Sequence, residues 1–199
     1  VMSSSLSILG DREYTLVTAE LTSATTTFLG NSFDYNFFNI GNGVYGIRPD
    51  SAETIDSLTG ISNIQFDDKK LNITTDIKAT FDQVTGLNTD SGEMFRLYNA
   101  AFARFPDADG LKYWIDQFSS GKNTRRVVAQ SFLGSAEFTE KYGSNVSDET
   151  YVNNLYKNVL GRDADTEGLN YWVGNLSNGI ETRYEALLGF AESAENKAL

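Results

Sequence analysis

The chain has 199 residues, of which 27 are acidic and 16 are basic, so its formal net charge is -11 at pH 7. A surface this acidic repels phosphate groups, which makes nucleic acid and anionic membranes poor partners and cations favoured ones. The chain contains no Cys and no His, which excludes disulfides, thiolate or imidazole metal ligands, and catalytic triads built on histidine. Any bound metal is therefore expected to be a hard cation held by oxygen atoms, with Ca²⁺ as the first candidate.

No apolar run approaches the roughly 20 residues that a membrane-spanning helix needs, so no membrane span is expected. Residues 1–5 lack the basic region and apolar stretch of a cleavable signal peptide. A chain that begins with Val1 and has Met2 second is expected to be part of a longer protein.

Residues 1–75 are rich in Thr, Ser, Asn and β-forming residues and predict a small β-rich unit. Strands are expected over residues 12–18, 33–38 and 44–47, with a turn at Gly41–Gly43 between the last two. A hairpin is expected from residues 64–66 and 71–73, with an inner face that carries Ile64, Phe66, Leu71 and Ile73.

Residues 76–92 are expected to form a connector with a short helix capped by Asp76. From residue 93 the apolar residues recur at helical spacing, beginning with Met94, Leu97 and Tyr98. The pattern predicts four helices over residues 93–150.

The same plan returns 58 residues later, over residues 151–199. The matched pairs include Leu97 and Leu155, Gly121 and Gly179, Thr124 and Thr182, Phe132 and Phe190, and the two Ser-Ala-Glu segments at 135–137 and 193–195. So many matches in one register indicate a tandem repeat of two helical modules.

Each module carries the motif Arg-x-x-Asp-x-x-Gly-Leu-x-Tyr-Trp. Its residues are Arg104, Asp107, Gly110, Tyr113 and Trp114 in the first copy and Arg162, Asp165, Gly168, Tyr171 and Trp172 in the second. A structural role is expected: the aspartates accept from free amides of the next helix, the glycines permit close approach or an unusual φ, and the arginines pair with a carboxylate of the same loop. Trp114 is expected to be buried, with Tyr113 nearer the boundary.

The alternative for this loop is calcium. Asp163, Asp165 and Glu167, followed by Gly168, reproduce the start of an EF-hand loop. The match ends there, because Gly174 stands where a bidentate glutamate is needed, and the first copy has Phe105 in place of Asp163.

No pair of carboxylates is singled out by its spacing, so the chain is not expected to be an enzyme. The aromatic and Asn-rich stretch of residues 31–45 leaves open a sugar-stacking surface, although aromatics at strand spacing are more often core residues.

The repeat resembles a bacterial family of helical modules classed as a domain of unknown function. The shared features are Leu-Tyr in the first helix, the arginine motif, and Phe-x-x-Ser-x-Glu-Phe near the module end. In the second copy Asn196 replaces the last Phe of that closing motif, seen as Phe138 in the first. The resemblance covers residues 58–199 and also extends to the helical linker domain of cyanobacterial phycobilisomes.

Modules of this family occur in tandem near the C-terminus of large secreted haemolysin-type (RTX) calcium-binding proteins and of surface-layer-like proteins. The resemblance therefore implies type I export, and it carries no established activity. The Gly-Gly-x-Gly-x-Asp calcium repeats of RTX proteins are absent from this chain.

The sequence thus predicts an α+β fold, with a small β-rich N-terminal unit followed by a tandem repeat of two four-helix modules. The expected function is a non-enzymatic C-terminal region of a secreted or cell-surface bacterial protein that serves export, attachment or assembly through other proteins or cell-surface components. An intracellular linker-like scaffold and an extracellular carbohydrate-binding module remain alternatives.

Overall fold

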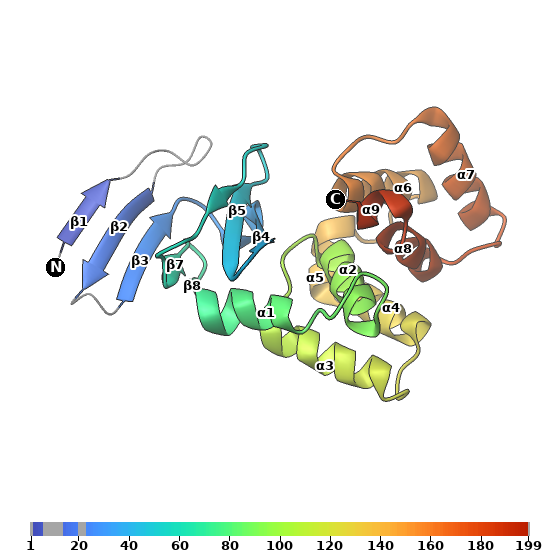
Figure 1. Cartoon of the computed structure of the whole chain (residues 1–199). Helices are drawn as coiled ribbons and strands as arrows, with labels where there is room; N and C mark the ends of the chain where they lie inside the picture. The colour runs from blue at the N-terminus through green and yellow to red at the C-terminus, as the bar shows by residue number, and fades with distance from the viewer. Residues whose placement is uncertain (1, 6–13, 20–22, 199) are drawn as a thin grey trace. The chain divides into compact units, whose positions relative to one another are not determined.

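The computed structural model describes residues 2–5, 14–19 and 23–198 (Figure 1). The chain divides into two compact units at the bond between Gln83 and Val84. We call the first the β-rich unit and the second the helical unit. The strands of the described residues all lie in the first, and the tandem helices lie in the second. The fold is therefore α+β, as the sequence predicted.

The β-rich unit is built from two sheets. Its strands are β1 (Met2–Ser5), β2 (Tyr14–Ala19), β3 (Ser23–Phe28), β4 (Tyr35–Gly41), β5 (Val44–Pro49), β6 (Asp56–Ser57), β7 (Asn63–Gln65) and β8 (Lys70–Asn72). The larger sheet has the order β1-β2-β3-β7-β8, in which only β3 and β7 are parallel neighbours. The smaller sheet is antiparallel, in the order β4-β5-β6.

The predicted strands are present with shifted bounds. The strand expected over residues 12–18 is β2, and residues 12 and 13 lie outside the described residues. Residues 33–38 divide between a 3₁₀ helix, η1 (Ser32–Asp34), and β4. The turn before β5 places Asn42 at φ 55° and Gly43 at φ 75°, and two left-handed residues give a hairpin turn whose twist matches the strands.

The core of the β-rich unit is aromatic. The Phe66 ring lies 5.7 Å from that of Phe28 and 5.2 Å from that of Tyr35, and all three side chains are buried. The predicted hairpin is present, and Ile64 pairs with Leu71 across it. Ile73, expected on the inner face of a strand, instead starts a helix.

That helix ends the β-rich unit, as a π-helical turn η2 (Ile73–Lys78) continued by α1 (Ala79–Asp82). The expectation that Asp76 caps it is wrong. The Asn72 side chain accepts from the amides of Thr74 and Thr75, at 2.9 Å each, so the helix begins earlier. Asp76 instead accepts from the Asn72 amide at 2.7 Å.

The helical unit repeats its helices at the 58-residue spacing. The first module has α2 (Asp90–Phe102), α3 (Ala108–Ser119), α4 (Arg125–Leu133) and α5 (Ala136–Tyr142). The second has α6 (Asp148–Leu155) continued by η3 (Tyr156–Leu160), then α7 (Thr166–Ser177), α8 (Arg183–Ala191) and α9 (Ala194–Lys197). Among the described helices, none is both long enough and apolar enough to cross a bilayer.

Helix starts are fixed by side-chain caps at matching positions of the two modules. Each cap accepts from the amide three residues ahead, and a cap of this kind contributes about 1 kcal/mol. The pairs are Thr89 and Ser147, Asp107 and Asp165, Thr124 and Thr182, and Ser135 and Ser193. Because Thr89 is a cap, α2 begins at Asp90, three residues before the start expected from the apolar periodicity.

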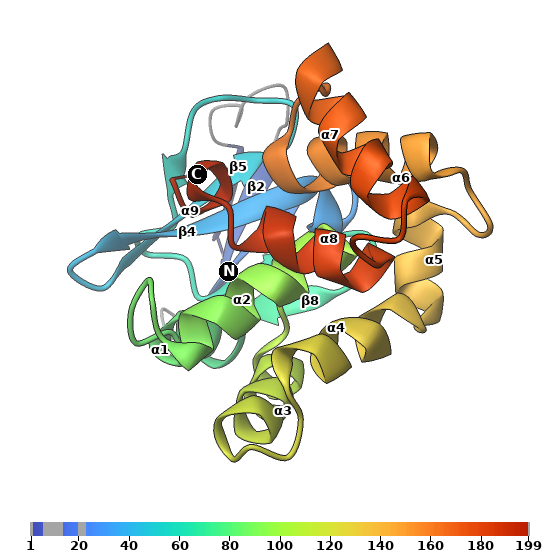
Figure 2. The same cartoon turned by 90° about the vertical axis from the view of Figure 1, so that its right-hand side faces the viewer.

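The two modules share one hydrophobic core. Helix α8 of the second module packs against both α2 and α4 of the first (Figure 2). Val128 and Ala129 of α4, with Ala186 and Leu187 of α8, have no exposed surface. The core also satisfies its polar atoms, since the buried Tyr142 hydroxyl donates to the Ala100 carbonyl at 2.7 Å.

Candidate functional site

An arginine that follows the first helix of the first module gathers three polar side chains. Arg104 donates from Nε and Nη2 to the two oxygens of Glu137, at 2.6 and 3.1 Å. Its Nη2 also donates to the Tyr98 hydroxyl at 3.1 Å, and that hydroxyl donates to Asp107. We call Tyr98, Arg104, Asp107 and Glu137 the first arginine clamp. It ties the C-terminal end of α2 to the first turns of α3 and α5.

The second arginine clamp consists of Tyr156, Arg162, Asp165 and Glu195. Arg162 donates to the two oxygens of Glu195 at 2.7 and 2.9 Å and lies 4.9 Å from the centre of the Tyr156 ring. It is the more exposed copy, with 41% of the Arg162 side chain accessible against 19% for Arg104. Water therefore screens the ion pair of the second clamp more than that of the first.

The main partner of each arginine differs from the sequence expectation. The aspartate of the same loop lies at 3.5 Å from Arg104 and 3.9 Å from Arg162, so these pairs are secondary. The primary partner is the glutamate of the Ser-Ala-Glu segment 33 residues later. The duplication of that segment was visible in the sequence, but its contact with the arginine depends on how α5 and α9 pack.

The first clamp shifts the pKa values of its members. Burial, and then the hydrogen bond to Asp107, raise the pKa of Tyr98 to about 12. Burial alone would raise the pKa of Asp107, but hydrogen bonds from Tyr98 and the Gly110 amide, together with the charge of Arg104, lower it overall. The carboxylate is therefore held ionised as an acceptor, which is a structural use of its charge.

The motif glycines allow close packing under the clamp tyrosines. Neither Gly110 nor Gly168 has a positive φ, so of the two reasons expected for glycine, close approach is the one that applies. A Cβ at Gly110 would lie 2.7 Å from an Asp107 carboxylate oxygen and 3.0 Å from the Tyr98 hydroxyl. At Gly168 it would overlap the Tyr156 hydroxyl.

The motif aromatics separate into a partly buried tryptophan and an exposed tyrosine. Trp114 packs edge-on against Phe132 at 5.0 Å, and Trp172 lies 4.8 Å from Phe190. Both tryptophans are partly buried, which is less than was expected for Trp114. Tyr113 and Tyr171 are 54% and 60% exposed. Helices α3 and α7, which carry them, lie at opposite ends of the helical unit in both views (Figures 1 and 2).

The calcium candidates Asp163, Asp165 and Glu167 are not brought together by the structure. Asp165 uses one oxygen to cap α7, at 2.6 Å from the Gly168 amide, and has Arg162 beside it. In the described part of the chain, no group of three or more acidic side chains is placed to hold a metal ion.

The aromatic stretch of residues 31–45 contributes mainly to the core. Tyr35, Phe37 and Tyr45 are buried, and Phe33 is 39% exposed. The buried rings are core residues, as aromatics at strand spacing usually are, and they are not available to stack on a sugar.

Comparisons with known proteins detect the same duplication. A family described as "Domain of unknown function (DUF4214)" matches residues 79–132 and again residues 129–199. Together the two matches span both helical modules and more than half of the chain. No curated protein and no solved structure matches it.

Proposed function

We propose that this chain, a member of the DUF4214 family across both helical modules, is a non-enzymatic region of a secreted or cell-surface bacterial protein. In this proposal the region serves export, attachment or assembly, and the helical unit supplies a surface for contact with other proteins or cell-surface components.

One observation carries the proposal. The duplicated polar residues of the motif are used inside the fold, as helix caps and as members of the arginine clamps. The motif aromatic that stays exposed in both copies is a tyrosine, Tyr113 or Tyr171. Exposed tyrosines are enriched where proteins bind each other, because one ring gives both apolar contact area and a hydroxyl.

Secretion is supported by sequence features. Residues 58–199 resemble modules of secreted RTX and surface-layer-like proteins, which implies type I export. The charge of -11 and the absence of Cys are compatible with an extracellular location.

Location is tested by fractionating the bacterium that encodes the chain and detecting the full-length protein with an antibody. We expect it in the medium or on the cell surface, where protease added to intact cells destroys it. A protein found only in the cytoplasm would contradict the proposal and favour the linker-like scaffold.

Attachment is tested with the double variant Tyr113→Ala, Tyr171→Ala. We expect its binding to intact cells of the same bacterium to be weaker by about tenfold or more, as for hot-spot residues. The matched control is Lys112→Ala, Asn170→Ala, which changes the exposed residue next to each tyrosine. Equal binding by both double variants would remove the tyrosines from the proposal. Specific binding on a glycan array would favour the carbohydrate-binding alternative.

A structural calcium ion is tested separately. If Asp163, Asp165 and Glu167 bind calcium in solution, the Tm of the chain rises between EDTA and millimolar Ca²⁺, and Asp163→Asn removes the rise. An unchanged Tm would dismiss this site.

A further inference from the structure

The segment that leads into the helical unit, residues 84–89, lies against the first turns of α2. We call it the lead-in segment. The Thr85 amide donates to the Ser91 hydroxyl at 2.9 Å. Gly92 leaves room for the segment, because a Cβ there would overlap the Gly86 carbonyl oxygen and lie 2.9 Å from that of Leu87. The lead-in segment therefore packs in a defined position against α2.

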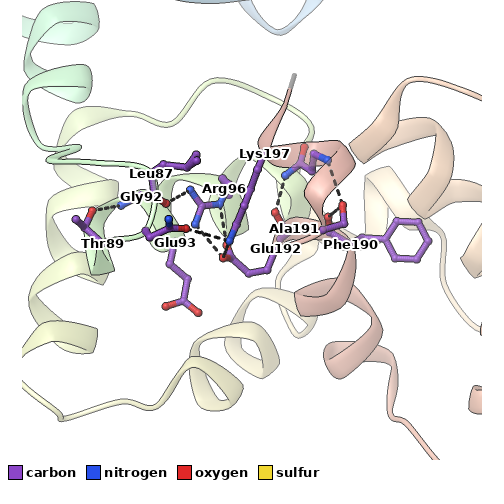
Figure 3. A network of polar contacts seen from close by, with 12 residues as sticks. Leu87, Thr89, Gly92, Glu93, Arg96, Phe190, Ala191, Glu192 and Lys197 are labelled. Carbon is purple, nitrogen blue, oxygen red and sulfur yellow. Dashed lines mark hydrogen bonds and ion pairs between the residues drawn. The ribbon is translucent and has the colours of Figure 1, made fainter.

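One arginine joins this segment to the far end of the chain (Figure 3). Arg96 donates from Nη1 to the Leu87 carbonyl at 2.6 Å. Its Nε and Nη2 donate to the two oxygens of Glu192, at 2.8 Å each. The Arg96 side chain is only 11% exposed, so its charge depends on these partners.

The last helical turn adds a second link. Lys197 Nζ lies 3.4 Å from Glu192 and donates to the Asn88 side chain at 3.3 Å. We call Arg96, Glu192 and Lys197 the latch. It places residues 192–197 directly over the lead-in segment, roughly a hundred positions earlier in the sequence.

The latch departs from the 58-residue repeat. The positions that match Arg96, Glu192 and Lys197 in the other module are Asn154, Gly134 and Thr139, which cannot form it. The segment before α6 is held from within its own module, where Arg183 donates to the Val146 carbonyl at 2.6 Å. The equivalent Arg125 pairs with Glu93 instead. The start of the first module thus depends on the end of the second.

We infer that the latch holds the lead-in segment on α2, so that displacing the C-terminal turn, residues 192–197, frees this segment, which leads to the β-rich unit. Without Glu192 the guanidinium of Arg96 would keep a buried charge with no carboxylate bound to it, which is strongly unfavourable. Arg96 then turns toward solvent and its bond to Leu87 is lost. A partner that binds the C-terminal turn, or a protease that removes it, would release the lead-in segment in the same way.

The test is hydrogen–deuterium exchange on the full chain, read on peptides covering residues 84–89. Glu192→Gln keeps the shape of the side chain and removes its charge. We expect exchange in the lead-in segment to become about tenfold faster or more, as local opening becomes easier, and protease cleavage there to increase.

Glu195→Gln is the matched control, because it makes the same change three residues away and breaks the pair with Arg162. We expect it to leave exchange at residues 84–89 unchanged. Lys197→Ala is a milder variant that removes the contacts of Lys197 with Glu192 and Asn88 and should raise that exchange about two- to threefold. It provides the test if Glu192→Gln unfolds the helical unit. Unchanged exchange in both latch variants, or an equal rise in Glu195→Gln, would overturn the inference.

Discussion

At the scale of single residues, the repeated motif depends on its glycines and aspartates. The glycines leave room for a tyrosine hydroxyl, and the aspartates cap the following helix. Asp165 caps α7, and the absence of a side chain at Gly168 lets the Tyr156 hydroxyl lie against the first turn of that helix. The motif is therefore a packing arrangement in which small changes of volume have large effects.

Gly168→Ala tests this arrangement. The added Cβ would overlap the Tyr156 hydroxyl and lie 2.9 Å from an Asp165 oxygen, so we expect the free energy of unfolding to fall by about 1–3 kcal/mol. Gly174→Ala in the same helix is the control. Its Cβ meets nothing within 4 Å, so the variant should be more stable by about 0.5–1 kcal/mol. Urea denaturation measures both, and equal effects would contradict the packing explanation.

The lowered pKa of Asp107 predicts part of the acid sensitivity of the fold. Since the folded pKa lies below the unfolded one, ionised Asp107 stabilises the fold above the unfolded pKa of about 3.9. This contribution is lost as the pH falls through the folded pKa. We expect the stability difference between wild type and Asp107→Asn to shrink between about pH 5 and pH 2. A difference that stays constant over this pH range would contradict this explanation.

At the scale of elements, the two copies of the motif helix pack differently. Helix α3 buries Leu111 completely, whereas α7 has no fully buried residue and its Leu169 remains partly exposed. The indole of Trp172 lies over Gly189 of α8, where a Cβ would stand 2.8 Å from the ring. This glycine therefore sets how closely α7 approaches α8.

Gly189→Ala should push the Trp172 ring outward. We expect a loss of about 1–3 kcal/mol and a red-shifted Trp172 emission, measured in a Trp114→Phe background so that one tryptophan reports. Gly134→Ala is the control, because its Cβ would make only ordinary contacts at 3.7 Å. An unshifted emission with unchanged stability would show that α7 is free to adjust.

How far the sequence predicts these elements depends on how local their causes are. The helical order and the caps Asp107 and Asp165 follow from spacing and turn chemistry within a few residues. The pairing of Arg104 with Glu137 does not, because it needs the position of α5 on α2. The start of a helix was predicted too late in two places. At Asn72 and at Thr89, polar capping residues begin the helix before the apolar pattern begins. The partial exposure of Trp114 also depends on tertiary packing.

At the scale of the whole molecule, the helical unit is two sequence modules with one core. Helix α8 fills space beside both α2 and α4, so neither module buries its apolar face alone. The latch adds a polar link between the start and the end of the unit. These features favour cooperative folding of both modules together.

The two tryptophans test this cooperativity, because each module contains one and the β-rich unit contains none. Trp172 reports in the variant Trp114→Phe, and Trp114 reports in the variant Trp172→Phe. We expect the urea transition of each variant to be two-state. The emission of its tryptophan should change together with the loss of helical circular dichroism in the same variant. A fluorescence transition that precedes or follows the loss of helix would mean that the modules unfold independently.

A shared core also fixes the distance between Tyr113 and Tyr171, since α3 and α7 are parts of one packed body. A partner with two sites at the matching distance would bind the second tyrosine at a high effective concentration, and the overall affinity would exceed that of either contact. A partner with sites at another spacing would gain nothing from the second copy. If the proposed function holds, the duplication would provide selectivity for repetitive surfaces, through avidity at a rigid spacing.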